Sequence, residues 1–400
     1  MTSIPKYKIV IIANYLPDKQ ESMLRVSTLY RNIVEEEGLK TKTLRPTDRI
    51  GKFRKIFPKM EKWLNYIDKF IIFSIELIGY NILNYYNKNI VYHITDHSNS
   101  IYSLCLLNKA KVITCHDVLA INSMLGKNPK KRLKFSGKLL QKLILVGIKC
   151  NHRIVCVSKK TENEIRKLVD DKNTKINTVL QPLNYKFEPI KKEKAIRIVI
   201  KQIVQYNECI ENGFILHVGG NQWYKNRMGL CAIYNELNSI RSNLNQSRIP
   251  LILAGKKPTR ELVCFAEKHR DLKIIFLISP TNKEINALYS LANLLLFPSI
   301  EEGFGWPIVE AMACGCPVVT TGKEPMTEAG GSAAIYIDPS DSVSAAKITN
   351  EVINWSKDRK KMQAELGFQN VKRFCRKAFA QEYRRAYEDA LGINKKDSSD

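Results

Sequence analysis

Short apolar runs recur along the chain, separated by longer segments whose apolar positions follow helical spacing. In the first half the runs lie at residues 9–13, 39–44, 90–94, 111–114, 151–158 and 176–180. An uninterrupted apolar run of this length suits a strand that is buried on both faces, and parallel strands need helical connections. The pattern therefore predicts an α/β domain with a doubly wound parallel sheet.

The same alternation restarts in the second half of the chain. We expect strands at residues 214–218, 250–254, 273–276, 294–297, 318–319 and 336–337. Between the two series, residues 183–212 break the rhythm with Pro189 and several lysines, although a helix-like piece spans 195–206. Two final helices are expected at 341–363 and 376–392. This organisation indicates two α/β domains in tandem.

The domain boundaries follow from this alternation. We expect a first domain at 1–185, a second at 186–375, a terminal helix at 376–392 that crosses back to the first domain, and a tail at 393–400. Two such domains place two sets of strand ends across a cleft from one another. That arrangement suits an enzyme with two substrates.

The most informative stretch runs from Pro298 to Thr321 and reads PSIEEGFGWPIVEAMACGCPVVTT. It follows a buried strand, turns at a glycine pair, forms a helix and enters the next strand. Pro307 suits the first helical position, since its fixed φ and missing N–H cost nothing there. Gly315 suits the left-handed residue that ends a helix. The loop therefore lies at the carboxyl end of a strand, where open α/β sheets bind ligands.

Two carboxylates mark this loop. Glu302 lies in it, and Glu310 follows on the first turns of the helix, with seven residues between them. Free N–H groups at a helix start favour a phosphate, while a carboxylate accepts hydrogen bonds from sugar hydroxyls. The pattern predicts a site for a phosphorylated and hydroxylated ligand, although a solvated Glu on a surface helix explains an isolated pair equally well.

Two further strand ends carry candidate chemistry. The loop HVGGNQWYKNR contains Gly219 and Gly220, which permit close backbone approach, and Lys225, whose ammonium group can bind a phosphate. His116 follows a strand of the first domain, where it can form a hydrogen bond with a hydroxyl or assist a proton transfer. The alternative is a purely structural histidine. Nothing near it has metal-ligand spacing, so we expect no catalytic metal.

The net charge of +25 points to an anionic partner or to a compositional bias. Residues 64–82 have the spacing of an amphipathic helix, but Asp68, Lys69 and Glu76 oppose insertion across a membrane. Lysines and aromatic residues interleave at 52–63. This region suits docking on an anionic membrane, or packing between domains.

Ten scattered cysteines form no C-x2-C pair. We therefore expect reduced thiols in a cytoplasmic protein, with the inner face of the membrane as its other location. The first residues lead directly into a strand, which predicts that no signal peptide is present.

The stretch from Glu302 to Glu310, running on to Pro317, resembles the E-x7-E signature of retaining glycosyltransferases of family 4, which have the GT-B fold. Further stretches resemble this family in the same order, and the resemblance covers most of the chain. They are residues 151–158, 176–182, 214–220 with 225–226, 284–299, 328–331 and 338–339.

The resemblance implies metal-independent transfer of a sugar from a nucleoside-diphosphate sugar to an acceptor hydroxyl, with retention and without a further cofactor. Glu302 would contact the donor sugar, as would His116 near the reacting carbon, and Glu310 would contact the ribose. Lys225 would neutralise the departing diphosphate. The remaining donor-binding residues would be Gly219, Gly220, Arg227, Gly303, Phe304 and Gly305.

The chain departs from the family pattern at two places. Many members carry an arginine where this chain has Gly220, so Arg227 or another base would supply that charge. Many also have a glycine pair after the first strand, where residues 14–27 contain no glycine. The acceptor side is therefore expected to differ.

Polysaccharide or glycolipid assembly, with a glycan or lipid-linked acceptor, fits these features best. An epimerase or phosphorylase of the same fold is one alternative. A basic protein with a degenerate site that binds nucleic acid or membrane is another. No aromatic and basic motif is typical of an RNA- or DNA-binding module, so no nucleic-acid partner is expected.

Overall fold

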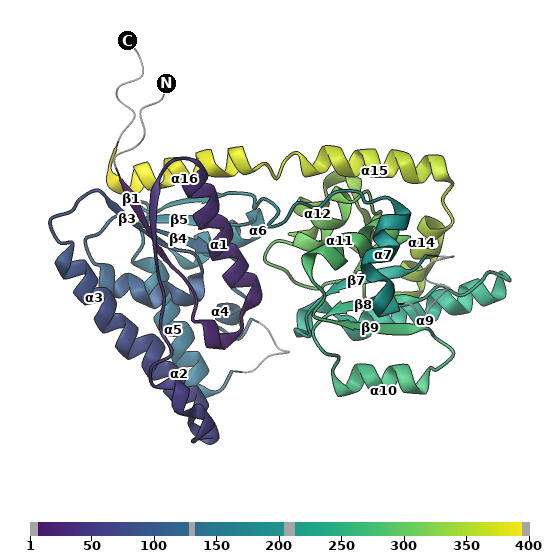
Figure 1. Cartoon of the computed structure of the whole chain (residues 1–400), viewed down its shortest axis with the longest axis horizontal. Helices are drawn as coiled ribbons and strands as arrows, with labels where there is room; N and C mark the ends of the chain where they lie inside the picture. Colours follow the sequence, from purple (N-terminus) through teal and green to yellow (C-terminus); the bar gives the residue numbers. More distant parts are fainter. Residues whose placement is uncertain (1–6, 128–132, 204–212, 394–400) are drawn as a thin grey trace, which may run out of the picture. The chain divides into compact units, whose positions relative to one another are not determined.

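The computed structural model describes residues 7–127, 133–203 and 213–393 (Figure 1). The chain divides into two compact units, residues 1–184 with 376–400, and residues 185–375. Residues 394–400 of the predicted tail, residues 204–212 of the segment between the two strand series, with Cys209, and residues 128–132 lie outside the described residues.

Unit 1 is built on a six-stranded parallel sheet in the order β2-β1-β3-β4-β5-β6. Its strands are β1 Lys8–Ile12, β2 Lys40–Leu44, β3 Ile90–Ile94, β4 Lys111–Cys115, β5 Arg153–Cys156 and β6 Lys175–Thr178. Its α-helices are α1 Glu21–Glu36, α2 Glu61–Tyr66, α3 Phe73–Leu83, α4 Leu119–Met124, α5 Phe135–Lys149, α6 Lys159–Leu168 and α16 Arg376–Leu391. The apolar runs therefore predicted each strand of this sheet to within a few residues.

Local signals explain where these helices begin and end. The Ser158 side chain accepts a hydrogen bond from the Thr161 N–H and so caps α6, as its type and place before the helix predict. Gly38 has a φ of 78° after α1, in the left-handed region that ends a helix. The capping residues thus fix the loops that leave the sheet.

The predicted helix at 64–82 consists of α2, a π-helical segment at Ile67–Ile72 and α3. Asp68 lies in the π segment and is fully buried, where its carboxylate accepts the N–H groups of residues 49, 50 and 51. Phe73 and Leu77 face the core. Of the apolar positions with helical spacing, Leu64 is buried, whereas Ile71, Ile75, Ile78 and Ile82 are exposed.

Unit 2 repeats the architecture in the order β12-β11-β10-β7-β8-β9. Its strands are β7 Ile215–Gly219, β8 Leu251–Gly255, β9 Ile274–Ile278, β10 Leu294–Phe297, β11 Val318–Thr321 and β12 Ile335–Ile337. Its α-helices are α7 Lys192–Ile203, α9 Arg227–Asn243, α10 Arg260–Lys268, α11 Asn282–Leu291, α12 Trp306–Ala313, α13 Met326–Gly330, α14 Ser342–Ile353 and α15 Lys357–Val371. Each residue of β10 is fully buried, as its continuous apolar run predicts.

Two expectations about helices in unit 2 were wrong. The helix expected at 341–363 is two helices, because Ser356 caps α15 by accepting the Arg359 N–H. Helix α12 begins at Trp306 rather than at Pro307, because Gly305 takes the cap position with a φ of 105°. Pro307 is therefore the second helical residue, where its missing N–H is equally harmless.

Helix α16 packs within unit 1 against α1 and the strands β3, β4 and β5. Phe379, Tyr383 and Tyr387 supply its buried face. The Tyr383 hydroxyl lies 2.8 Å from Thr114 Oγ1 of β4, across 269 positions of sequence. The C-terminal helix is thus an integral part of the first unit's core.

Candidate active site

The order in which strands are added to the sheet of unit 2 reverses between β7 and β10. The chain builds β8 and β9 on one side of β7 and later returns to place β10, β11 and β12 on the other. Open α/β sheets bind ligands beyond the carboxyl ends of the strands at such a switch point. The loops that leave β7 and β10 carry Lys225 and Glu302 respectively.

These two predicted residues are in contact. Lys225 Nζ lies 2.7 Å from Glu302 Oε1, and the side chains are only 14% and 8% exposed. The Lys225 ammonium also lies 5.1 Å from the centre of the Phe297 ring. Opposite charges that are this poorly solvated interact far more strongly than a surface pair.

Backbone contacts hold the two loops together. Asn226 adopts a left-handed φ of 53°, and its side-chain amide donates to the Pro298 carbonyl at 3.1 Å. The Ile300 N–H donates to the Tyr224 carbonyl at 2.7 Å. Hydrogen bonds from residues next to Lys225 and Glu302 to main-chain carbonyls thus set the positions of these two side chains.

The loop after β7 that contains Gly219 and Gly220, hereafter the glycine loop, comes close to the neighbouring strand β8. Gly219 pairs with Gly255 in the sheet, and a Cβ on Gly255 would lie 2.0 Å from the Gly219 carbonyl oxygen. Gly255 has a φ of 140°, which other residues rarely adopt. Gly220 adjoins Gln222, whose side-chain oxygen would be 2.3 Å from a Cβ at Gly220. A larger residue at Gly255 would displace the loop.

Arg227 lies beneath this loop. Its guanidinium donates to the Gly219 carbonyl at 2.7 Å and to Asn221 Oδ1 at 2.8 Å. Burial lowers the pKa of Arg227. Its Nε is buried without a partner among the described residues. The structure therefore shows Arg227 bracing the loop, and its predicted contact with the donor remains a prediction.

Glu310 lies on α12, which starts beyond the loop Gly303-Phe304-Gly305. It is 9% exposed, and the Tyr289 hydroxyl donates to its Oε2 at 3.0 Å. Phe304 is buried with its ring edge-on to Phe374. The E-x7-E spacing thus places one carboxylate in the loop and the other inside the first turns of the helix.

Sequence reasoning did not select His217, which lies directly under the loop that contains Gly219 and Gly220. Its Nδ1–H donates to the Leu296 carbonyl at 3.1 Å, and its Nε2 is buried with no partner among the described residues. That nitrogen would be 3.2 Å from a Cβ on Gly219. Burial lowers the pKa of His217 to about 3, so the ring is neutral. Its place just before the glycines was the available signal.

Unit 1 has a corresponding switch point between β1 and β3. Asn14, which follows β1, donates through its amide to Asp96 Oδ2 at 2.6 Å, and Asp96 follows β3. Burial raises the pKa of Asp96, but the neighbouring His97, His116 and Ser98 outweigh burial and hold it below its ordinary value. The glycine-free loop after the first strand therefore supplies a side-chain amide at this point.

His116 follows β4 and belongs to unit 1, whereas the other predicted site residues belong to unit 2. Its Nε2 lies 2.8 Å from the Thr95 carbonyl oxygen, and its Nδ1 lies 3.4 Å from the amide nitrogen of Gln181. Burial lowers the pKa of His116. The ring is therefore a neutral group with both nitrogens engaged.

In the described ranges, no three His, Cys, Asp or Glu side chains gather as a set that could hold a metal ion. No helix among the described residues is long and apolar enough to span a membrane.

Comparison with known families locates a domain in the second half of the chain. Residues 191–366 match the family model described as glycosyl transferases group 1. Residues 191–366 are therefore similar to the group 1 glycosyltransferases. The match covers Lys225, Glu302 and Glu310, and it confirms the family resemblance carried by the E-x7-E stretch.

Curated relatives of the chain include two O-antigen chain mannosyltransferases. The chain is 28% identical over 233 residues to O-antigen chain mannosyltransferase B of Escherichia coli, which is 58% of each protein. It is 41% identical over 69 residues to O-antigen chain mannosyltransferase RfbU of Salmonella typhimurium, covering 17% of this chain and 20% of the relative. Alignments thus cover less than two thirds of these relatives.

Solved structures match nearly the whole chain. Sucrose-phosphate synthase from Thermosynechococcus elongatus aligns with a TM-score of 0.70 at 14% identity, over 97% of this chain and all of that one. Anabaena HepE in complex with UDP and glucose aligns with a TM-score of 0.68 at 13% identity, over 96% of this chain and all of that one. Together with the two parallel six-stranded sheets, these matches confirm the predicted GT-B fold.

Proposed function

We propose that this protein transfers a sugar, with retention and without a metal, from a nucleoside-diphosphate sugar to a hydroxyl of a glycan or lipid-linked acceptor in polysaccharide assembly. The observation that carries the proposal is the contact of Lys225 with Glu302 at the switch point of the group 1 domain. A cation that binds phosphate and a carboxylate that binds hydroxyls meet there, at the place where such sheets bind ligands.

Lys225 and the N-terminus of α12 stabilise the departing diphosphate. Lys225 presents a positive charge and the start of α12 presents free N–H groups, both beyond the carboxyl ends of the strands. Gly219, Gly220 and Gly305 allow the phosphates to approach the backbone closely. Because Lys225 is only 14% exposed, its charge acts in a poorly solvated site and neutralises the leaving group strongly.

Donor binding rearranges the carboxylates. The diphosphate competes with Glu302 for the Lys225 ammonium, and the released carboxylate accepts a hydrogen bond from a donor-sugar hydroxyl. Glu310 is buried beside Tyr289 and accepts a hydrogen bond from the ribose. The free state therefore holds both acceptors in place with internal partners.

The acceptor hydroxyl attacks from the face that the diphosphate leaves, and its proton passes to a phosphate oxygen. Retention then needs no carboxylate nucleophile. His116, neutral and with a hydrogen on Nε2, shares this hydrogen between the Thr95 carbonyl and an oxygen of the donor sugar. The names of the relatives support transfer, and mannosyl transfer in particular, over epimerisation or phosphorolysis.

A thermal-shift experiment tests donor binding. The melting temperature should rise with one of GDP, UDP, ADP or dTDP, and with its mannose or glucose conjugate, because a ligand of the native state stabilises by mass action. Lys225→Met should abolish the shift, whereas Lys268→Met, on an exposed residue of α10, should keep it. A shift that survives Lys225→Met would show that the diphosphate lies elsewhere.

Product analysis tests the reaction. Incubation of the responding donor with a lipid-linked or oligosaccharide acceptor should give a glycoside with the donor's anomeric configuration. Formation of an epimerised nucleotide sugar in the absence of an acceptor would show that the protein is an epimerase rather than a transferase.

We also infer that unit 1 docks on the anionic cytoplasmic face of a membrane. Ile71, Ile75, Ile78 and Ile82 are 44–66% exposed along the π segment and α3. The preceding segment exposes Phe53, Ile56, Phe57, Met60 and Trp63, interleaved with Lys52, Lys55, Lys59 and Lys62. Helix α5 exposes Phe135, Leu139, Leu143 and Val146, and its Ser136 contacts Lys62. Apolar side chains for the acyl boundary and lysines for anionic head groups support this partner.

Vesicle flotation tests the docking. The protein should bind vesicles of phosphatidylglycerol with phosphatidylcholine, and binding should weaken with salt. The double variant Ile75→Ser and Ile78→Ser should lose binding, whereas Leu366→Ser, an equally exposed leucine of α15 in unit 2, should not. Equal binding of both variants would remove the α3 face from the docking surface.

A further inference from the structure

A chain of buried hydrogen bonds links the C-terminal helix to the sheet of unit 1. The Tyr387 hydroxyl lies 2.9 Å from His93 Nδ1, and His93 Nε2 lies 2.9 Å from Thr114 Oγ1. Thr114 Oγ1 in turn lies 2.8 Å from the Tyr383 hydroxyl. The four side chains are almost completely buried, so these bonds are made within the protein rather than with solvent.

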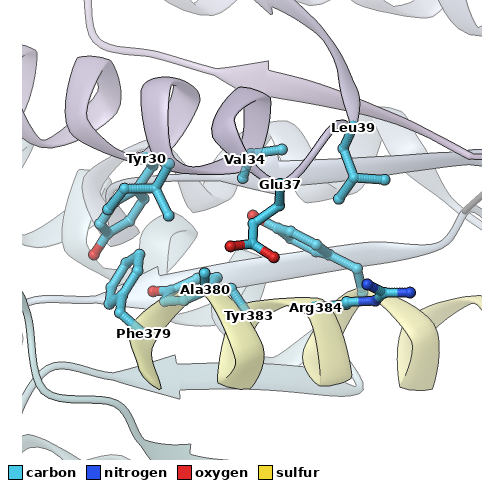
Figure 2. A pocket seen from close by; sticks show the side chains of 10 residues that line it. Tyr30, Val34, Glu37, Leu39, Phe379, Ala380, Tyr383 and Arg384 are labelled. Carbon is cyan, nitrogen blue, oxygen red and sulfur yellow. The ribbon is translucent and has the colours of Figure 1, made fainter. Parts of the chain in front are cut away.

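The network continues toward His116 through Tyr30 and Gln181. Tyr30 of α1 lies beside Phe379 of α16 (Figure 2), with ring centres 5.0 Å apart, and its ring packs against Tyr383, with ring centres 5.1 Å apart. The Gln181 amide donates to the Tyr30 hydroxyl at 2.6 Å, and the same nitrogen lies 3.4 Å from His116 Nδ1. The amide nitrogen has two hydrogens, one for each contact.

The partners of His116 determine where its hydrogen lies. The Thr95 carbonyl can only accept, so Nε2 must carry the hydrogen at 2.8 Å. Nδ1 then has a lone pair and accepts from Gln181. We propose that Gln181 and Tyr30 are positioning residues that keep the His116 ring fixed and neutral, with its hydrogen on Nε2.

Tyr30 holds the amide in place beside the histidine. Gln181 is 3% exposed, and its nitrogen is drawn to the Tyr30 oxygen. The Tyr30 hydroxyl can pair with either end of the amide, but a rotated amide would turn its oxygen toward the lone pair of Nδ1, which is repulsive. The Tyr30 ring packs in turn against Tyr383, with ring centres 5.1 Å apart. The C-terminal helix therefore reaches His116 within unit 1 through Tyr383, Tyr30 and Gln181.

Some of the charged and titratable groups around His116 favour protonation of its ring, and others oppose it. Asp96 and Asp117 favour a charged ring, His97 opposes it, and the neighbouring His93 is neutral because burial lowers its pKa to about 3. Tyr30 and Tyr383 remain uncharged, since burial raises the pKa of each hydroxyl. Desolvation is the largest influence on His116 and favours the neutral ring. The Gln181 donor acts in the same direction.

The consequence for catalysis rests on the proposed function. A neutral ring with hydrogen on Nε2 can donate to an oxygen of the donor sugar, but it cannot act as a proton donor of the imidazolium type. It also adds no positive charge that would hold the diphosphate after transfer. Gln181 and Tyr30 thereby assign His116 to sugar binding rather than to acid catalysis.

Nitrogen NMR of protein labelled at histidine tests the proposal without any substrate. The chain has six histidines, and His116→Asn identifies the His116 signals. The wild-type ring should carry hydrogen on Nε2 only at pH 6.5, where an exposed histidine is about half charged. A hydrogen on Nδ1, or a charged ring at this pH, would overturn the proposal even if no variant folded.

Three variants separate the positioning role from a structural one. Gln181→Met keeps the side-chain length but removes the donor, so the protonation constant of His116 should rise about three- to tenfold, as expected for one lost hydrogen bond. Tyr30→Phe should raise it by less, because the amide is only loosened. Tyr102→Phe is the control, since its buried hydroxyl donates to the Lys69 carbonyl instead. Equal protonation constants in wild type and Gln181→Met would contradict the proposal.

Turnover provides a second measurement. In Gln181→Met, kcat should fall about tenfold to a hundredfold with little change in the donor KM, as for a misplaced catalytic group. If the NMR result holds but no transfer is found with any donor, the network stands and the proposed reaction fails. If transfer is found but His116 titrates normally, only the positioning role fails.

Discussion

At the scale of single residues, the contact between Lys225 and Glu302 has opposite consequences for stability and for binding. Removing one partner from a poorly solvated ion pair leaves a charge without compensation, which costs more than a surface pair contributes. The same removal frees the other partner for a ligand. On the proposed function, we therefore expect the pair to couple folding to the binding of the donor.

We predict that Glu302→Gln destabilises the protein by about 3 kcal/mol, the lower end for breaking a buried pair, because the new amide oxygen still faces Lys225. Binding of the matching nucleoside diphosphate should be as tight as in wild type or tighter, since the carboxylate no longer competes. Transfer should fall by about 10²- to 10³-fold. Chemical denaturation, calorimetric titration and turnover measure the three effects. Weaker diphosphate binding by tenfold or more would contradict the exchange of partners.

At the scale of elements, the start of α12 depends on a single backbone conformation. Gly305 has a φ of 105°, and a Cβ there would lie 3.3 Å from Ile308 and 3.6 Å from Ala329. The glycine therefore fixes the direction in which the helix leaves the loop, and with it the separation of the two carboxylates.

We predict that Gly305→Ala destabilises unit 2 by about 1–3 kcal/mol, the cost of a residue in a sparsely populated backbone region. The diphosphate-induced rise in melting temperature should shrink as well. Gly79→Ala is the matched control, because Gly79 lies within α3 with open space around its Cβ position. That change should stabilise unit 1 by about 0.5–1 kcal/mol. Calorimetry measures both, and equal effects in the two variants would contradict the strain at Gly305.

The elements also show what periodicity can and cannot determine. Buried strands were predictable because a run buried on both faces has no polar positions, as in β10. The face of a helix was not predictable by the same reasoning. Ile71, Ile75 and Ile78 follow helical spacing, yet Phe73 and Leu77 face the core. A helix with apolar residues on both sides gives no indication of which side meets the protein.

At the scale of the whole molecule, the residues of the candidate site that could be predicted from sequence are those that lie in local motifs. Lys225 and Glu302 lie in separate glycine-marked loops, and the parallel topology brings their strand ends together. The pairing of Asn14 with Asp96 and the link from Tyr383 to Thr114 span 82 and 269 positions. No local pattern encodes such contacts, because they depend on which strands and helices become neighbours.

Buried neutral histidines in both units make the whole molecule sensitive to acid. Burial lowers the pKa of His93 in unit 1 and of His217 in unit 2 to about 3. An unfolded chain binds these protons near pH 6.5, so stability is complete above that pH and is lost as the pH falls toward 3. Each histidine should cost about 2 kcal/mol at pH 5, a large share of a typical stability of about 5–15 kcal/mol.

Urea unfolding at pH 7 and pH 5 measures this loss for unit 2, because Trp223, Trp306 and Trp355 lie in that unit and report its unfolding by fluorescence. His217→Leu should unfold more easily at pH 7, since the Leu296 carbonyl loses its donor, yet it should lose about 2 kcal/mol less than wild type on acidification. Carboxylates titrate equally in both proteins, so the difference isolates His217. The same acid-induced loss in the two proteins would mean that His217 is protonated in the folded state, and that the space beneath the glycine loop is better solvated than its burial indicates.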